Sequence, residues 1–143
     1  MLRWEMSLAT LSTPKAELLA ELKGKRVALV GNARSLVERD EGADIDRADI
    51  VIRINRAPMP ASRTHGTRTD WLALATSITG PDLDRIRPHR MLWMSHKRKR
   101  LSWRIASSRG FYLHRISDWR RLREALGAPP TTGLMMVEFL AES

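Results

Sequence analysis

The chain has no cysteine, which excludes disulfides, thiolate metal sites and a cysteine nucleophile, and which is typical of a reducing compartment. No apolar run approaches the roughly 20 residues that a membrane span needs. The N-terminus also lacks the long apolar core of a secretory signal. We therefore expect a cytoplasmic protein, and a peripheral position at the inner membrane is a second expectation.

The length of 143 residues is enough for one compact domain. Hydrophobic residues make up 43% of the chain and charged residues 29%, which excludes a disordered protein. We expect residues 1–143 to form a single domain, with residues 1–24 as an N-terminal helical extension.

The net charge of +9 is unevenly distributed. All Lys and Arg residues of the second half lie between Arg85 and Arg123, where Asp118 is the only acidic residue. This region should attract anions. An anionic membrane surface is one hypothesis for the partner.

The basic run at residues 96–100 lies near Trp93 and Trp103, which is one possible pattern for a nucleic-acid patch. We favour a solvated helix face whose tryptophans fill the core, because no known nucleic-acid module accompanies the run. Nucleic acid is therefore not the partner that we expect.

Five short apolar runs predict β-strands buried on both faces. They cover residues 26–30, 50–54, 71–75, 91–94 and 111–113. Helical patterns cover residues 15–23, 81–87, 97–108 and 117–126. This alternation predicts an α/β fold with a mainly parallel sheet flanked by helices. A further helix after residue 133 leads to no strand, so we expect the sheet to be incomplete at the C-terminus, although a terminal helix that simply docks on the sheet is an equal alternative.

Polar residues follow the first two predicted strands. Gly31 and Asn32 come after the first, and a following helix would present free N–H groups to a phosphate there; an ordinary turn with Asn32 as a helix cap is the alternative. Asn55 and Arg56 come after the second strand, where open α/β sheets bind ligands, although a solvated loop is equally compatible.

A third candidate site segment lies at the start of the last predicted helix. Thr131, Thr132 and Gly133 either cradle a phosphate or cap the helix. The four histidines lack the spacing of a metal pair, and the aspartates at 44, 46 and 49 precede a strand, where capping or solvation is expected. We expect no metal site.

In order along the chain, these segments resemble the sialyltransferases of glycosyltransferase family 29. Residues 26–70 are similar to the long sialyl motif of that family: Val-Gly-Asn at 30–32, Asp-Ile-Asp at 44–46, Arg-x-Asn-x-Ala-Pro at 53–58 and Gly-Thr-Arg-Thr-Asp at 66–70. Residues 130–134 resemble the opening of the short sialyl motif. Together the similar segments cover roughly a third of the chain.

The resemblance implies a Rossmann-like, single-sheet glycosyltransferase fold that binds a CMP-activated sugar. It implies transfer to a glycan or glycolipid acceptor with inversion and without a metal or cofactor, the CMP-sugar being a substrate. The residues that it implies for the donor nucleotide are Gly31, Asn32, Ser35, Asn55, Arg56, Thr131, Thr132 and Gly133.

The chain departs from the family pattern in several places. Ser35 stands where many members have a second Asn, and the cysteines of animal members are missing, as in a bacterial version. No histidine here matches the catalytic one, which we expect beyond residue 143. We therefore expect a truncated, inactive sialyltransferase-like chain, either a fragment or a decayed copy. The alternative is a basic nucleic-acid- or anion-binding module without catalysis.

Overall fold

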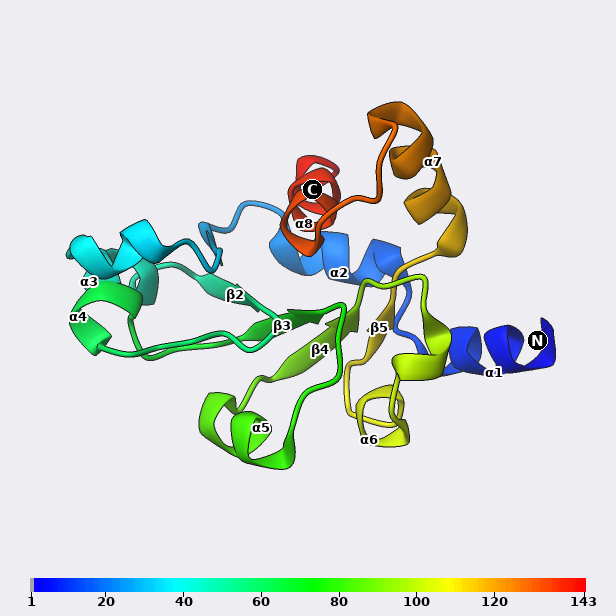
Figure 1. Ribbon diagram of the computed structural model, residues 1–143, viewed down its shortest axis with the longest axis horizontal. Helices are drawn as coiled ribbons and strands as arrows, with labels where there is room; N and C mark the ends of the chain where they lie inside the picture. The colour runs from blue at the N-terminus through cyan, green and yellow to red at the C-terminus, as the bar shows by residue number, and fades with distance from the viewer. Residues whose placement is uncertain (1) are drawn as a thin grey trace.

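One five-stranded parallel sheet organises the computed structural model, which describes residues 2–143 (Figure 1). The strands are β1 (Val27–Val30), β2 (Ile50–Ile54), β3 (Trp71–Leu74), β4 (Arg90–Trp93) and β5 (Tyr112–Leu113). They lie in sequence order, and every neighbouring pair is parallel. The predicted α/β fold with a mainly parallel sheet flanked by helices is confirmed.

Eight α-helices and two 3₁₀ helices are found among the described residues. The α-helices are α1 (Leu2–Leu11), α2 (Lys15–Leu22), α3 (Gly42–Asp46), α4 (Ser62–His65), α5 (Gly80–Ile86), α6 (Trp103–Ala106), α7 (Ile116–Leu126) and α8 (Thr132–Ala141). The 3₁₀ helices are η1 (Arg34–Glu38) and η2 (Arg98–Arg100). The helix predicted over residues 97–108 is divided into η2 and α6, because the Ser102 hydroxyl accepts from the Ile105 N–H and caps a new helix.

The order of the strands determines which helices cover which face. Right-handed crossovers between strands that are added in one direction all lie on the same face of the sheet. Accordingly, α5 and α6 lie below the sheet in Figure 1. Helices α2, α7 and α8, which precede β1 or follow β5, cover the face above it. Strands β2 to β5 are therefore largely buried on both faces, which explains their continuous apolar runs. The same prediction is wrong for β1, where Val27, Ala28 and Leu29 are only half-buried.

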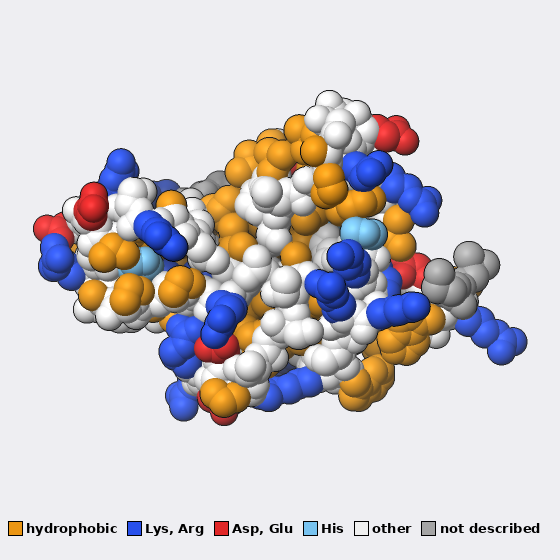
Figure 2. Space-filling view, in the orientation of Figure 1, with side chains coloured by type: hydrophobic (Ala, Val, Ile, Leu, Met, Phe, Trp, Pro, Cys, Tyr) orange, Lys and Arg blue, Asp and Glu red, His pale blue; other side chains and the backbone are white. Residues whose placement is uncertain are grey.

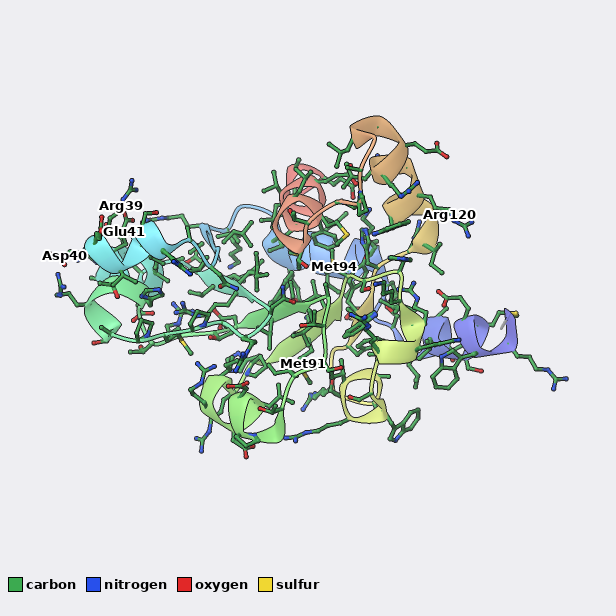
Figure 3. All side chains as sticks on the ribbon, in the orientation of Figure 1. Arg39, Asp40, Glu41, Met91, Met94 and Arg120 are labelled. Carbon is green, nitrogen blue, oxygen red and sulfur yellow. The ribbon has the colours of Figure 1, made fainter. Side chains whose placement is uncertain are left out.

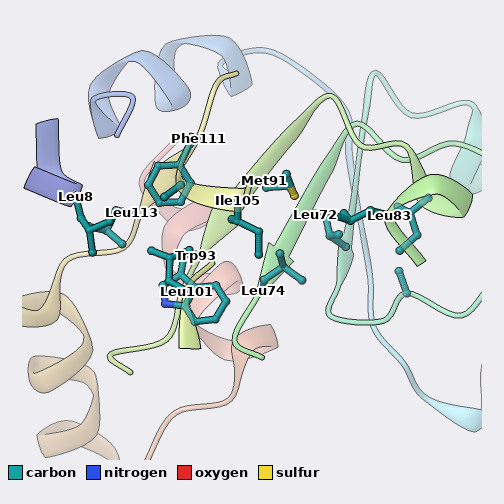
Figure 4. Close-up of a cluster of buried hydrophobic side chains, with 13 residues drawn as sticks. Leu8, Leu72, Leu74, Leu83, Met91, Trp93, Leu101, Ile105, Phe111 and Leu113 are labelled. Atoms are coloured by element: carbon teal, nitrogen blue, oxygen red, sulfur yellow. The ribbon is translucent and has the colours of Figure 1, made fainter. Parts of the chain in front are cut away.

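Alternate strand residues supply the two sides of the core. Leu72, Leu74 and Trp93 pack toward α5 and α6, and Figure 4 shows this cluster. Figure 3 labels Met91 and Met94, which extend to opposite sides of the sheet. Trp103 is 64% exposed, so the expectation that it helps to fill the core is wrong, whereas the same expectation for Trp93, which is fully buried, is confirmed.

Helix α8 begins where the sequence predicts. The Thr131 hydroxyl accepts a hydrogen bond of 3.1 Å from the Leu134 N–H and caps the helix. Met135, Met136 and Phe139 are buried against the sheet. No helix among residues 2–143 is long and apolar enough to cross a membrane.

Candidate functional site

Asn32 connects the ends of the first two strands. It lies two residues after β1, and its side-chain Nδ2 donates a hydrogen bond of 3.1 Å to the carbonyl oxygen of Ile54, the last residue of β2. Because the strands are parallel, their carboxyl ends share one edge of the sheet, where open α/β folds bind ligands. The Asn32 side chain is therefore fixed at that edge.

Asn55 is held by the neighbouring strand. Its backbone N–H donates to the Ala73 carbonyl (2.8 Å), and its side-chain Oδ1 accepts from the Ala75 N–H (2.9 Å). Its φ of 53° is left-handed, a conformation that Asn tolerates better than most residues, and Ala57 has a φ of 44°. Two such residues in one turn indicate a backbone that its surroundings hold in a strained form, as at many ligand sites.

A cleft opens between the ends of β1, β2 and β3 and the start of α5. Its volume is about 680 Å³, within the range of small-molecule sites. Its lining includes Asn32, Asn55, Arg56, Met59, Thr76 and Arg85. We call it the Asn32–Asn55 cleft.

Charged side chains give this cleft a positive balance. Arg85 donates to the carbonyl oxygens of Arg56 (2.7 Å) and Ala57 (3.1 Å) and to Asp82 (3.2 Å). Its hydrogen bond to Asp82 holds the pKa of that carboxyl below its usual value. The Arg56 side chain is 81% exposed, and its guanidinium lies 3.8 Å from Asp82. One carboxylate therefore faces two guanidinium groups, which leaves a net positive charge for an anion.

The sequence did not indicate Thr76, Asp82 or Arg85 as site residues. Arg85 belongs to the basic region, but no local motif distinguishes it from its neighbours. Only the crossover through α5, which returns Arg85 to the turn after β2, brings it to the cleft.

The start of α8 approaches β2 from the other face of the sheet. A Cβ built on Gly133 would lie 3.6 Å from the Ile54 Cδ1 atom. Thr131 is exposed and Thr132 is buried beside it. These three residues do not line the Asn32–Asn55 cleft; they flank the same end of β2, at Ile54, from the side of α8.

Gly31 and Ser35 lie at a different place. They line a second cleft of about 410 Å³ beside η1 and α3, which shares no lining residue with the Asn32–Asn55 cleft. A helix presenting N–H groups directly after β1 is a wrong prediction, because the chain forms only the five-residue 3₁₀ helix η1 there. Asn32 is not its cap either, since the cap position is Ala33.

Arg53 does not reach the cleft. It is 1% exposed, and its Nε donates to the Arg68 carbonyl (2.9 Å) and the Thr69 hydroxyl (3.0 Å). Burial lowers the pKa of its guanidinium, and the nearby Asp46 opposes that shift. Arg53 therefore anchors the turn before β3 and does not meet a ligand at the sheet edge.

Asp46 and the segment 66–70 form a structural turn. The Asp46 carboxylate accepts from the backbone N–H groups of Thr67 (3.0 Å) and Arg68 (3.1 Å). Burial alone would raise the pKa of Asp46, but these hydrogen bonds hold it below its usual value. Two of the segments that resemble the long sialyl motif, residues 44–46 and 66–70, thus stabilise the fold.

No histidine among the described residues lines the Asn32–Asn55 cleft. His65 and His114 are buried, and burial lowers the pKa of His114 to about 4. His96 stacks on Trp119 with ring centroids 3.8 Å apart, and burial together with neighbouring cations lowers its pKa. Within residues 2–143, no group of three or more His, Asp or Glu side chains is arranged to hold a metal ion.

Two solved structures are similar to this chain in fold. A mammalian sialyltransferase in complex with Gal-β-1-3GalNAc-ortho-nitrophenol is similar in fold, with a TM-score of 0.58 and 18% identity over 90% of this chain and 55% of that chain. A second crystal structure of a mammalian sialyltransferase has a TM-score of 0.59 and 19% identity over 90% of this chain and 54% of that one. This chain thus spans about half the length of these sialyltransferases. No curated protein matches it in sequence.

The model of glycosyltransferase family 29 (sialyltransferase) matches residues 5–103. The matched part contains the long-motif segments, including Asn32 and Asn55, whereas Thr131 to Gly133 lie outside it. It is well over half of the chain, and the fold agrees with that of two solved sialyltransferases. The chain therefore belongs to glycosyltransferase family 29, the sialyltransferase family.

Proposed function

We propose that this chain is the donor-binding part of a sialyltransferase-like glycosyltransferase and binds a CMP-activated sugar across the carboxyl end of β2. The observation that carries the proposal is that two separate segments meet at Ile54. Asn32 contacts its carbonyl oxygen, and Gly133 lies against its side chain. The nucleotide would extend from the Asn32–Asn55 cleft toward the start of α8.

The donor groups at this edge fit the chemistry of a departing nucleotide. CMP leaves as an anion, so its phosphate needs fixed donors where the negative charge develops. Arg56 offers an exposed guanidinium, and the start of α8 offers backbone N–H groups and the hydroxyls of Thr131 and Thr132. We propose that these groups, without a divalent cation, stabilise the leaving phosphate.

The proposed reaction is an in-line displacement. A hydroxyl oxygen of a glycan or glycolipid acceptor attacks the anomeric carbon, the bond from that carbon to the CMP phosphate oxygen breaks, and the configuration inverts. A general base takes the hydroxyl proton. Because no histidine of residues 2–143 lines the cleft, we assign no general base, and we expect the chain alone to bind the nucleotide without transferring sugar.

Calorimetric titration of the chain with CMP, and with cytidine as the phosphate-free ligand, tests the proposal. We expect Arg56→Gln to weaken CMP binding about tenfold, as the loss of one charge-assisted contact implies, and to leave cytidine binding unchanged. Arg47→Gln is the matched control, because Arg47 is also exposed but lies outside the cleft. No CMP binding, or equal losses in the two variants, would contradict the proposal.

A further inference from the structure

A third cleft lies at the same edge of the sheet as the Asn32–Asn55 cleft, where β4 and β5 end. It has a volume of about 650 Å³ and lies between α1, η2 and α7. Its lining includes Trp4, Glu5, His96, Arg98, Lys99 and Arg120. Figure 2 shows Lys and Arg side chains gathered beside a histidine in this part of the molecule, and Figure 3 labels Arg120 on α7. We call it the basic cleft.

A salt bridge between Arg98 and Glu5 lies in the wall of the basic cleft. Arg98 is 8% exposed, and its Nε and Nη2 donate to the Glu5 carboxylate at 3.0 and 2.9 Å. Its guanidinium also donates to the carbonyl oxygens of Ser95 and His114, both at 2.6 Å. Arg98 and Glu5 therefore tie α1 to the ends of β4 and β5. Their opposite charges compensate each other, with Arg98 buried and the Glu5 side chain 33% exposed.

Four further cations line this cleft without an acidic partner. None of Lys97, Lys99, Arg100 and Arg120 forms a salt bridge within the part of the chain that the structure describes. The Asn32–Asn55 cleft differs, because its two arginines are compensated in part by Asp82. Four like charges in one concave surface repel one another and attract an anion.

Flat ring surfaces accompany these charges. Trp4 lines the basic cleft and is 48% exposed. His96 is held in place by its stack on Trp119. An exposed indole provides a broad apolar face and one N–H donor, which can contact the apolar face of a sugar ring and one of its hydroxyls. Phosphate alone or a bare polyanion would need only the cations.

We infer that the basic cleft binds a sugar that carries an acidic group, with the acid on Lys97, Lys99, Arg100 and Arg120 and the ring on Trp4. The assignment of this sugar as the acceptor rests on the proposed function. All strands are parallel, so the basic cleft and the Asn32–Asn55 cleft lie along one edge of the sheet. A donor and an anionic acceptor would therefore occupy neighbouring parts of the same edge.

Calorimetric titration with glucose 6-phosphate, glucose and inorganic phosphate tests the inference. We expect glucose 6-phosphate to bind at least tenfold more tightly than either of the others. The triple variant Lys97→Gln, Lys99→Gln, Arg100→Gln should weaken its binding by at least tenfold. The control triple Lys23→Gln, Lys25→Gln, Arg26→Gln removes the same kinds of exposed charge at the start of β1 and should leave binding unchanged.

Trp4→Ala separates a sugar site from a simple anion site. The variant should weaken glucose 6-phosphate binding several-fold and leave the weak binding of inorganic phosphate unchanged. Equal binding of the two ligands, or equal effects of the two triple variants, would overturn the inference. Tighter binding of a single-stranded oligonucleotide or of phosphatidylglycerol vesicles, lost in the basic-cleft triple variant, would also overturn it.

The two proposals fail separately. The basic-cleft triple variant should bind CMP as the unchanged chain does, since none of its three residues lines the Asn32–Asn55 cleft. If the unchanged chain binds glucose 6-phosphate but not CMP, the nucleotide site alone is refuted. The reverse result would refute the sugar site alone.

Discussion

The side-chain nitrogen of Asn32 lies 3.1 Å from the carbonyl oxygen of Ile54, and the side chain of the same Ile54 lies against Gly133. One residue at the end of β2 therefore connects the segment after the first strand with the start of the last helix. These segments are about a hundred residues apart, and the sheet brings them to one edge.

Changing Asn32 should alter both stability and nucleotide binding. Asn32→Ala removes the hydrogen bond to Ile54 and should lower the free energy of unfolding by about 1 kcal/mol. Asn32→Asp should cost more, because it sets a carboxylate against a carbonyl oxygen. Urea denaturation measures the free energy of unfolding, and a CMP titration measures the affinity. We expect both variants to bind CMP more weakly than the unchanged chain does. Unchanged affinity would remove Asn32 from the site.

Gly133→Ala should separate binding from folding. The new Cβ would make an ordinary contact with Ile54 at 3.6 Å, and alanine favours the helix by up to about 1 kcal/mol relative to glycine. We expect unchanged or raised stability in urea together with weaker CMP binding, because the methyl group would obstruct close approach to the N–H groups of α8. A variant that binds CMP normally would place the phosphate elsewhere.

Gly42→Ala should destabilise the protein severely. A Cβ there would lie 1.8 Å from the Ser62 carbonyl oxygen and 2.7 Å from that of Arg63, so the backbones of α3 and α4 would have to separate. Gly31→Ala is the control, because nothing lies within 4 Å of its new Cβ. In thermal denaturation we expect a large fall in Tm for the first variant and little change for the second; similar Tm values would contradict the α3–α4 packing.

Acid should destabilise the fold through His114. Burial lowers its pKa from 6.5 to about 4. On acidification the unfolded chain therefore binds a proton at His114 at a higher pH than the folded chain does. The contribution of neutral His114 to the free energy of unfolding is fully present above pH 6.5. It is lost as the pH falls toward and through 4, by up to about 3 kcal/mol. Urea denaturation across this range should show a smaller fall for His114→Gln. The matched variant of the exposed His89, His89→Gln, should keep the full fall.

The strands could be predicted because their apolar runs are short and continuous, although only β2 to β5 are largely buried and three of the four residues of β1 are half-buried. The run at residues 50–54 coincides with β2, and that at 71–75 exceeds β3 by one residue. Thr131 was likewise recognisable, since a hydroxyl residue before an apolar helix is a local signal for a cap. These features depend on a few adjacent residues, and so the sequence displays them.

Long-range pairings could not be predicted in this way. The apolar pattern does not show that Arg53 is buried, because its carbonyl and hydroxyl partners come from the next turn. The pairing of Arg98 with Glu5 joins residues 93 positions apart. The short helices α3 and α4 owe their place to the close approach of Gly42 to Ser62 and have little helical periodicity of their own. The cytoplasmic location stays a prediction.

Amide chemical shifts during a CMP titration test the central claim most directly. We predict that the backbone amides of Asn32, Asn55 and Gly133 shift together along one saturation curve, while those of Lys97 and Lys99 stay in place. Shifts confined to the basic cleft, or separate curves for the turn after β2 and the start of α8, would contradict a single nucleotide site at the end of β2.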